Sequence, residues 1–332
     1  MKYTTLALGL LLAGPGLAQT AIVERPVLTV YTYDSFVSEW GPGPAVEKAF
    51  EETCDCDLKF VGAGDGAALL ARLKLEGART KADVVLGLDT NLTTAAAATG
   101  LFAPHGQAPK LDLPVAWDDP IFLPYDWGYL AFVYDKTEMM DVPQSFAELA
   151  ASDARIVIQD PRSSTPGLGL LMWAKMVAGD DAPALWGDLA DNIVTVTKGW
   201  SEAYGMFLSG EADMVLSYTT SPAYHLIAEG DATKAAVAFS GGNYMQIEVA
   251  GKIAGSKQPE LADKFLAFMD EEAFQSIIPT TNWMYPAVTP QAGLPKGFET
   301  LVVPEKALIY PAAEAADLRD GALAEWLAAL SR

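Results

Sequence analysis

The sequence predicts an α/β protein with two lobes, each a mixed or parallel sheet flanked by helices. Three observations predict this fold class. Short apolar runs alternate with segments of helical periodicity, which is typical of α/β layers. A chain of 332 residues, 51% hydrophobic and 20% charged, is long enough for two cores. No glycine-rich linker divides it, so two lobes would have to be joined by strands that cross between them.

Each expected element follows from a local pattern. A strand is expected where a short apolar run ends at turn residues, and a helix where apolar residues recur at helical spacing. The helix at 67–76 is the best marked, because Asp65 can cap it and Leu69, Leu70 and Leu73 form an apolar stripe. We expect strands at 27–33, 83–88, 130–134, 155–159, 214–218 and 246–250, and helices at 45–52, 67–76, 167–177, 201–208, 259–269 and 322–330.

Two longer segments are candidates for the crossings between the lobes. They are PYDWGYLAFVYD at 124–135 and NYMQIEVAGKI at 243–253. Crossings at these places would build one lobe from both ends of the chain. The sequence therefore predicts lobe 1 at 24–126 and 245–332, and lobe 2 at 127–244.

The first residues predict export. Lys2 precedes an apolar run from Leu6 to Leu12, and small residues follow up to Ala18. This is the pattern of a secretory signal peptide at 1–18, too short for a membrane anchor. Its removal takes Lys2 away and changes the formal net charge from −21 to −22. So acidic a chain is a poor candidate for binding nucleic acid or anionic lipid, although it could favour a cationic ligand.

The cysteines of the chain are Cys54 and Cys56, in TCDCDLKF. In an oxidising compartment two nearby thiols usually pair. A metal site would need more ligands than this stretch offers, and both histidines, His105 and His225, lie far away in sequence. A structural disulfide is therefore preferred to a metal site.

Enzyme motifs are absent or incomplete. GAGDG at 62–66 resembles a phosphate-binding loop only superficially, and GWSEA at 199–203 lacks the final glycine of a nucleophile elbow. Nothing around His105 or His225 supports a catalytic base. The sequence therefore predicts no catalysis, no cofactor and no bound metal.

Four segments place aromatic residues among small polar ones at expected strand ends and loops. In open α/β sheets, ligands bind beyond the carboxyl ends of strands. Aromatic faces there suit a flat or cationic guest, gaining roughly 2 kcal/mol or more for a desolvated cation, and Asp65 could accept hydrogen bonds from amino groups. Any single aromatic is equally well explained as core. The segments are VLTVYTYDSFVSEWGPGP (27–44), TVTKGWSEAY (195–204), LSYTTSPAYH (216–225) and TTNWMYPAV (280–288).

DPRSSTPGLGLLMW at 160–173 predicts the start of a helix, with Pro166 in the first turn and Ser164 or Thr165 near the cap. The free N–H groups of such a helix end could bind an anion such as phosphate. Ordinary capping explains the same residues.

These motifs, together with KADVVLGLD at 81–89, resemble the periplasmic thiamine-binding proteins of bacterial ABC transporters, in order and over essentially the whole mature chain. The Cys-x-Cys pair is shared too. The resemblance implies a two-lobed type II periplasmic-binding-protein fold and delivery of thiamine and its phosphate esters to an inner-membrane permease with its ATPase. It implies ligand-binding roles for Tyr33, Trp40, Asp65, Gly66, Ser164, Thr165, Trp200, Tyr218, Thr219, Thr220, Ser221, Tyr224 and Trp283.

Three alternatives remain open at this point. A class of thiaminase shares the fold but needs a cysteine nucleophile in the cleft. Ferric-ion carriers on this fold use adjacent tyrosines, whereas five residues separate Tyr218 from Tyr224 here. A third alternative keeps the carrier and changes its cargo to choline or a polyamine.

Overall fold

The computed structural model describes residues 25–331. The predicted signal peptide at 1–18 lies outside these residues. The strands are β1 (Val27–Thr32), β2 (Asp57–Gly62), β3 (Val84–Asp89), β4 (Phe102–Ala103), β5 (Phe122–Asp135), β6 (Ile156–Gln159), β7 (Ile193–Thr197), β8 (Met214–Tyr218), β9 (Lys234–Ala236), β10 (Asn243–Ile253), β11 (Tyr285–Pro286) and β12 (Ala307–Leu308).

The helices alternate with these strands. They are α1 (Gly43–Glu51), α2 (Gly66–Glu76), α3 (Thr93–Ala97), α4 (Phe146–Ala150), α5 (Thr165–Ala178), α6 (Ala182–Leu189), α7 (Trp200–Leu208), α8 (Pro222–Tyr224), α9 (Pro259–Met269), α10 (Glu272–Gln275), α11 (Ile278–Thr281) and α12 (Ala312–Leu330). Short 3₁₀ turns occur at Gly77–Arg79, Gly179–Asp181 and Phe298–Thr300, and a π-helical turn at His225–Glu229.

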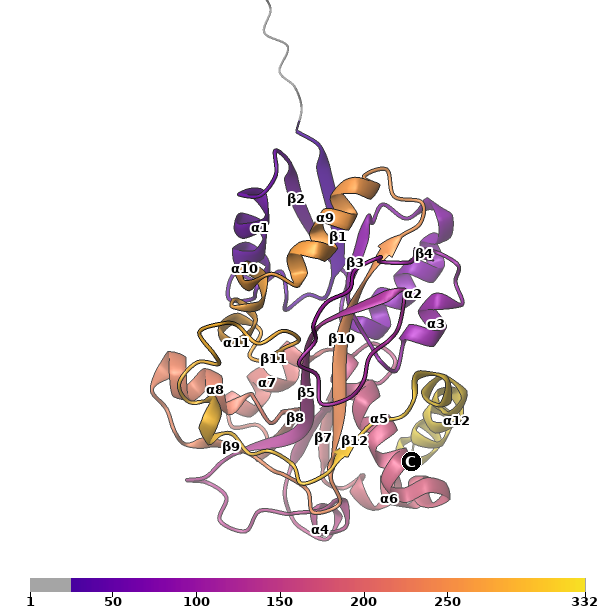
Figure 1. Ribbon diagram of the computed structural model, residues 1–332. Coiled ribbons are helices and arrows are strands. Elements are labelled where there is room, and N and C mark those ends of the chain that lie inside the picture. Colours follow the sequence, from indigo (N-terminus) through magenta and orange to yellow (C-terminus); the bar gives the residue numbers. More distant parts are fainter. Residues whose placement is uncertain (1–24, 332) are drawn as a thin grey trace, which may run out of the picture.

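Two long strands join the halves of the molecule (Figure 1). The strand order is β2-β1-β3-β10-β5-β8-β6-β7. Within each half the pairs are parallel: β1 pairs with β2 and β3, and β6 pairs with β7 and β8. The junction is antiparallel, since β10 pairs with both β3 and β5, and β5 with β8. The two segments expected to cross between lobes are therefore these junction strands.

Both halves have an aromatic core. In the first, Val30 and Leu86 of the buried parallel strands face helices α1 and α9, where Phe50 packs edge-on against Phe265 with 5.2 Å between ring centroids. In the second, buried Trp173 of α5 packs against Phe146, with 4.9 Å between centroids. Strands covered on both faces need continuous apolar runs, and this is why the sequence marks them clearly.

Most expected elements are confirmed to within a few residues, and the helix 259–269 and strand 214–218 match α9 and β8. Strands β2 and β7 were missed. Both lie at edges of the sheet and bury only one residue each, and neither carries a continuous apolar run. The expected helix at 322–330 is the second half of α12, which begins at Ala312.

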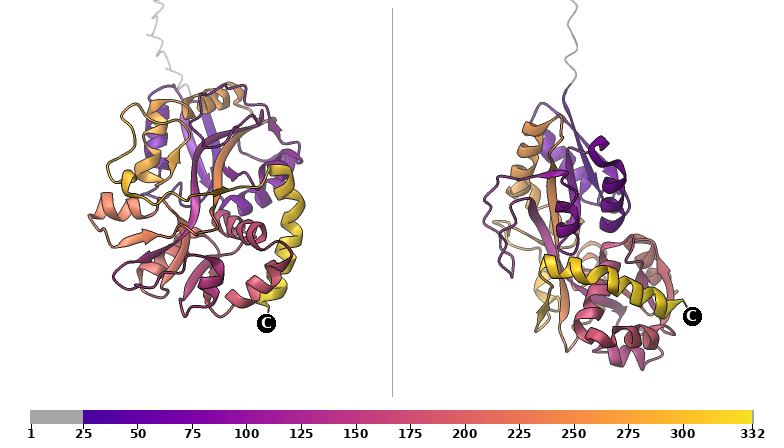
Figure 2. Two further views of the ribbon diagram at one scale, coloured as in Figure 1. Left: turned by 60° about the horizontal axis from the view of Figure 1, so that its bottom comes forward. Right: turned by 90° about the vertical axis from the view of Figure 1, so that its right-hand side faces the viewer.

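Helix α12 runs beside α5 and α6 (Figure 2). Trp326 packs against Trp186 of α6, and Glu325 pairs with Lys175 of α5 at 3.0 Å. The C-terminal helix thus packs along the outer helices of the second half, α5 and α6. Within residues 25–331, no helix combines the length and the apolar character that crossing a membrane requires.

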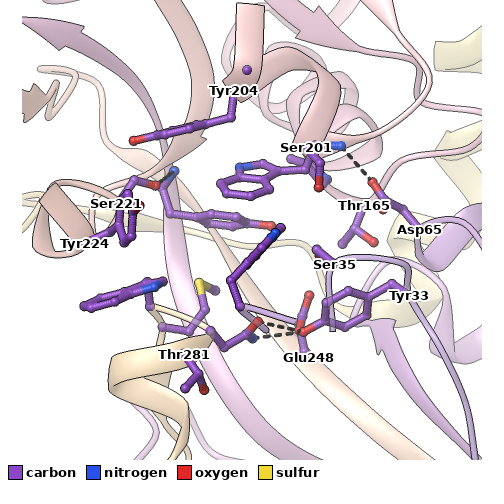
Figure 3. Close-up of a pocket in the computed structure, with 18 of the residues that line it drawn as sticks. Tyr33, Ser35, Asp65, Thr165, Ser201, Tyr204, Ser221, Tyr224, Glu248 and Thr281 are labelled. Atoms are coloured by element: carbon purple, nitrogen blue, oxygen red, sulfur yellow. Dashed lines mark hydrogen bonds between the residues drawn. The ribbon is translucent and has the colours of Figure 1, made fainter. Parts of the chain in front are cut away.

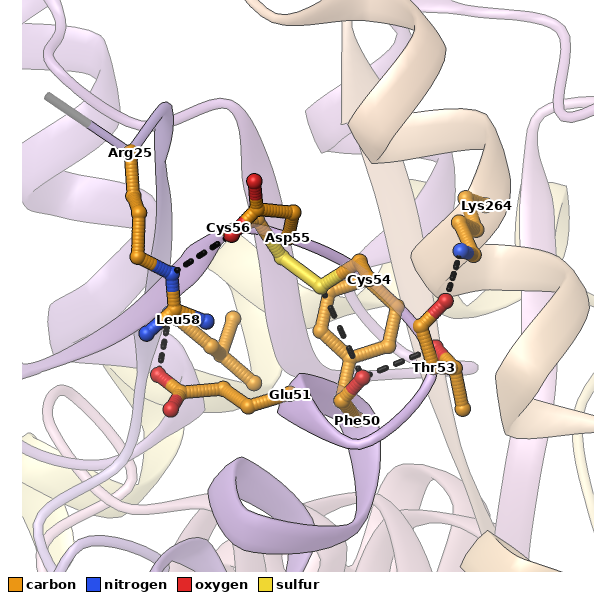
Figure 4. The surroundings of a disulfide bond; sticks show 9 residues. All are labelled: Arg25, Phe50, Glu51, Thr53, Cys54, Asp55, Cys56, Leu58 and Lys264. Atoms are coloured by element: carbon orange, nitrogen blue, oxygen red, sulfur yellow. Dashed lines mark hydrogen bonds and ion pairs between the residues drawn. A yellow bond between two sulfur atoms is a disulfide. The ribbon is translucent and has the colours of Figure 1, made fainter. Parts of the chain in front are cut away.

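Cys54 and Cys56 form a disulfide, as predicted (Figure 4). It closes the turn between α1 and β2, where Thr53 donates a hydrogen bond to the carbonyl of Phe50 at 2.8 Å. Buried Cys56 packs in the core of the first half. The disulfide is a local structural element.

Candidate functional site

A cavity of about 510 Å³ opens between the two halves (Figure 3). Its size suits a small organic ligand. The first half contributes the end of β1 and the start of α2, the second the starts of α5 and α7 and the end of β8, and the segment 280–284 closes one side. The lining residues are Tyr33, Ser35, Trp40, Asp65, Thr165, Pro166, Trp200, Ser201, Tyr204, Gly205, Leu208, Tyr218, Ser221, Tyr224, Ala228, Glu248, Thr280, Thr281, Asn282, Trp283 and Met284.

Nine of the predicted site residues line this cavity, and four do not. The nine come from six separate segments, which the fold brings together as the aromatic pattern predicted. Gly66, Ser164, Thr219 and Thr220 are buried behind the wall. These four residues could contribute to ligand binding only through backbone groups or by supporting residues that line the cavity. The nine are Tyr33, Trp40, Asp65, Thr165, Trp200, Tyr218, Ser221, Tyr224 and Trp283.

Aromatic side chains form opposite walls. Trp40 and Trp200, from the two halves, lie with 6.1 Å between ring centroids, and Trp200 stacks on Tyr204 at 4.9 Å. On the other side Tyr224 meets Trp283 edge-on at 5.4 Å. Trp40 is 54% exposed, which is unusual for a tryptophan and marks it as a surface available for contact. Such walls can hold a flat ring or a cation.

Trp283 has a backbone φ of +56°, and no other non-glycine residue within 25–331 has a positive φ. A bulky residue in the left-handed region is strained, and such residues cluster at functional sites. The indole therefore faces the cavity at a cost in backbone energy.

Asp65 contacts both halves of the molecule. It occupies the N-cap position of α2, but the expected side-chain cap is wrong: its carboxylate instead accepts a hydrogen bond from the backbone N–H of Trp200, 3.3 Å away (Figure 3). Burial raises the pKa of Asp65 to about 6, and the Ser164 hydroxyl and the Trp200 N–H offset part of this effect because they favour the charged form. At neutral pH the cavity therefore holds a carboxylate ready to accept from a donor ligand.

The starts of α2 and α5 meet without a gap. The backbone N–H of Gly66 donates to Thr165 Oγ1 at 2.9 Å, and a Cβ on Gly66 would lie 2.6 Å from that oxygen. Ser164 occupies the N-cap position of α5, yet its hydroxyl caps no N–H, so ordinary capping does not explain it. Pro166 lies in the first turn, as predicted.

The segment after β8 is organised by serine hydroxyls. Ser217 accepts from the indole Nε1 of Trp200 at 2.8 Å and lies 2.7 Å from Ser221 Oγ. The hydroxyl of Tyr218 donates to Gln246 Oε1 at 3.1 Å. These contacts hold the Trp200 and Tyr218 rings in place through the indole N–H and the hydroxyl, and they leave the ring faces free to contact a ligand. Such preorganisation reduces the entropy cost of ligand binding.

Sequence reasoning missed the acidic floor of the cavity. Glu248 of β10 accepts hydrogen bonds from Tyr125 at 2.5 Å and Tyr33 at 3.0 Å (Figure 3 shows the latter). Asn282 donates to Asp126 at 2.6 Å beside it. The available signal was a glutamate between Ile247 and Val249 in the crossing strand NYMQIEVAGKI.

Sequence reasoning also missed Tyr204 and its support. Its hydroxyl lies 3.0 Å from His225 Nε2, and His225 Nδ1 lies 2.7 Å from Glu229. His225 thus packs in the helical turn behind the wall, as the sequence favoured over catalysis. The π-helical turn at His225–Glu229 widens the chain here and brings Ala228 to the cavity.

A family model described as bacterial extracellular solute-binding protein matches residues 42–275. This chain belongs to that family. A thiamine-binding periplasmic protein of Escherichia coli (strain K12) is 56% identical over 319 residues, which cover 95% of this chain and 97% of the relative. One of Salmonella typhimurium (strain LT2) is 54% identical over 334 residues, covering 100% and 99%.

Solved structures agree with this family membership. A periplasmic thiamin binding protein superposes with a TM-score of 0.91 at 54% identity, covering 98% of this chain and 100% of that one. A ferric binding protein from Campylobacter jejuni, at 19% identity and a TM-score of 0.73, shares the fold alone. The two-lobed periplasmic-binding-protein fold predicted from the sequence is confirmed, as is a binding protein in place of an enzyme.

Proposed function

We propose that this chain captures thiamine in the periplasm and delivers it to the inner-membrane permease of an ABC transporter with its ATPase. The observation that carries the proposal is a cavity that combines aromatic walls with a buried carboxylate, Asp65, at the junction of the two lobes. Thiamine offers a complementary set of groups: a flat aminopyrimidine and a permanently positive thiazolium. The thiamine-binding relatives support this ligand over other organic cations.

The geometry supports a division of roles. The aromatic walls would surround both rings, where cation–π attraction compensates the lost hydration of the thiazolium. Asp65 would accept a hydrogen bond from the exocyclic amino group of the pyrimidine. The wall residues in this proposal are Tyr33, Trp40, Trp200, Tyr218, Tyr224 and Trp283, with Ser221, Thr219 and Thr220 holding the segment that carries Tyr218.

Binding of thiamine phosphates is part of the proposal. The helices α2 and α5 begin side by side at Gly66 and Thr165, and helix N-termini attract anions. The buried Ser164 hydroxyl lies at the same place, close to the Asp65 carboxylate, whose pKa it lowers. These groups would receive a phosphate ester if the lobes separate slightly. The same place carries the Asp65 carboxylate, so phosphate and carboxylate would compete, and unesterified thiamine is the expected preference.

Capture would involve closure of two lobes about β5 and β10, with the predicted bounds 24–126 and 245–332 for one lobe and 127–244 for the other, except that α12 packs against α5 and α6 and so belongs with the second lobe. Three hydrogen bonds join the start of α2 to the starts of α5 and α7, the third from the N–H of Ala68 to the carbonyl of Ser163 at 3.1 Å. They support a closed arrangement for this structure. Export by a signal peptide at 1–18, cleaved after Ala18, would place the carrier where a permease can receive its ligand.

The proposal is tested by titration of the mature chain after unfolding and refolding to remove carried ligand. Tryptophan fluorescence is followed during addition of thiamine, thiamine phosphates, choline, spermidine and ferric ion. Saturable quenching by thiamine at low concentration is expected, with weaker or no response to the others. A response to choline or spermidine alone would reject the cargo, and a visible charge-transfer band with ferric ion would favour a metal carrier.

A further inference from the structure

The floor of the cavity carries carboxyl groups on three neighbouring strands. Glu248 of β10 is in register with Asp89 of β3 on one side and with Asp126 of β5 on the other. In-register residues of adjacent strands lie about 5 Å apart. Asp89 and Asp126 are completely buried, and Glu248 is 6% exposed. Glu248 is the member of this carboxyl row that reaches the cavity.

Neutral groups surround the carboxyl row. Glu248 accepts from the phenols of Tyr125 and Tyr33 and, through its other oxygen, from the amide of Gln246 at 3.0 Å. None of the ion pairs within residues 25–331 includes a member of the row. The further charged group that faces Glu248 is the carboxyl of Asp65, from the start of α2. Every charge that acts on Glu248 is therefore negative.

Two oxygens of the row have no protein partner. They are Asp89 Oδ2 and Asp126 Oδ1, both buried, while the second oxygen of each carboxyl accepts a hydrogen bond from Asn91 N–H or Asn282 Nδ2. A buried carboxylate with an unsatisfied oxygen is costly, and protonation removes the charge. Burial raises the pKa of Asp126 and of Glu248; the charge of Glu248 raises that of Asp126 further, and the charge of Asp65 raises that of Glu248, in agreement with this geometry.

We propose that the carboxyl row, which reaches the cavity at Glu248, is a specificity element that holds a proton in the ligand-free protein and loses it to solvent when a cationic ligand enters. This inference rests on the proposed function, because the ligand must carry a fixed positive charge. An O–H bond within the row breaks, the proton leaves to water, and the Glu248 carboxylate faces the ligand cation. The ligand charge replaces the proton, so the net charge of the cavity is conserved.

Two consequences follow. Affinity for thiamine rises with pH, by up to tenfold per pH unit for one released proton, over the range in which the carboxyl row holds its proton in the ligand-free protein. A neutral isostere of thiamine, with carbon in place of the thiazolium nitrogen, gains nothing from this exchange. Glu248 would then select for the cation, while the aromatic walls accept either ring.

The inference is tested by calorimetric titration with thiamine between pH 6 and 8, in buffers of different ionisation enthalpy. A net proton release that decreases toward pH 8 is expected for the unaltered chain and for Asp65→Asn. It should be lost in Glu248→Gln, which should also reduce the preference for thiamine over the neutral isostere by tenfold or more. Asp270→Asn is the matched control, because Asp270 has a raised pKa but lies outside the cavity lining.

A second measurement uses the ligand-free protein and does not depend on Glu248→Gln folding well. The side-chain carboxyl carbons of ¹³C-labelled glutamates are followed by NMR as pH is raised, and one carbon should titrate well above the others and shift on addition of thiamine. Thiamine binding without proton release, or with release that persists in Glu248→Gln, would overturn the inference alone. Absence of thiamine binding at every pH would instead overturn the proposed function.

Discussion

The carboxylate of Asp65, at the start of α2, accepts a hydrogen bond from the backbone N–H of Trp200, at the start of α7, over 3.3 Å. The two residues belong to different halves of the molecule, and both line the cavity. The Asp65 carboxylate is thus placed to bind ligand, and its hydrogen bond to Trp200 requires the two halves to be together.

Replacing Asp65 by Ala should weaken thiamine binding by about 10- to 100-fold, since hydrogen bonds to a charged group contribute about 1.5–3 kcal/mol. The change removes both the acceptor for the ligand and a contact between the halves. Calorimetric titration measures the affinity. Asp213→Ala, which breaks a surface ion pair with Arg155, is the control and should leave affinity unchanged. Equal affinities in both variants would refute the role of Asp65.

Trp200→Ala and Trp283→Ala should each reduce thiamine affinity by tenfold or more, because each removes one aromatic face of the cavity. Both residues are only partly buried, so the melting temperature should change little. Trp173→Ala should do the opposite. Trp173 is fully buried in the core, and its truncation should cost about 3–5 kcal/mol of stability while the folded fraction binds normally. Fluorescence titration and thermal melts separate the two effects.

Gly66→Ala should hold the lobes apart. The added Cβ would lie 2.6 Å from Thr165 Oγ1 and 2.8 Å from the carbonyl oxygen of Gly87, so one helix start must move away. We expect a larger radius of gyration by X-ray scattering and weaker thiamine binding. Gly321→Ala in α12 is the control: no atom lies near the added Cβ, and the change should stabilise the protein by about 1 kcal/mol. If Gly66→Ala and the unaltered chain gave the same scattering curve in the presence of thiamine, the lobes would not close where α2 and α5 begin.

Replacing both Cys54 and Cys56 by Ser should have a small effect. A cross-link across so few residues removes little chain entropy from the unfolded state, on the order of 1–2 kcal/mol. The disulfide also lies outside the cavity lining. We therefore expect a melting temperature lower by a few degrees and an unchanged affinity for thiamine. A large loss of affinity would show that the turn between α1 and β2 communicates with the cavity.

Stability of the ligand-free protein should fall as pH rises from about 4.5 to about 7. Burial raises the pKa of Asp270 to about 7, so the folded state keeps a proton that the unfolded chain releases at lower pH. Raising the pH through this window therefore favours the unfolded state, and the loss is complete above the folded pKa. Thermal melts across the window measure the slope, which Asp270→Asn should reduce.

At acidic pH, stability should change with pH in the opposite direction and fall as the pH falls. Lys234 pairs with Asp135 at 2.7 Å, and hydrogen bonds from Lys234 and Thr137 lower the pKa of Asp135 despite its burial. The stability from this pair is present above the usual pKa of an aspartate and disappears as pH falls below it. Lys234→Met should make the melting temperature depend less on pH below pH 4 and leave its pH dependence above pH 4 unchanged.

Sequence patterns predicted the elements that are buried or capped. The strand 214–218 is continuous and apolar because both its faces are covered, and the helix 259–269 begins with a proline and carries an apolar stripe. Tyr33, Trp40, Trp200, Tyr224 and Trp283 could be identified because aromatic residues among small polar ones are unusual on loops. The disulfide followed from two cysteines close together in a chain that the sequence predicts to be exported.

The tertiary structure alone decided how these pieces act together. Glu248 looked like one acid among many, and its role depends on Asp89 and Asp126, which lie more than 100 positions away but one strand away in the sheet. The sequence predicted Asp65 as a helix cap, whereas in the structure its carboxylate accepts a hydrogen bond from the backbone N–H of Trp200, at the start of a helix in the other half. Local patterns encode burial and backbone geometry, because those depend on neighbouring residues. Pairings across a cleft or a sheet depend on register and lobe position, which no local stretch of the chain contains.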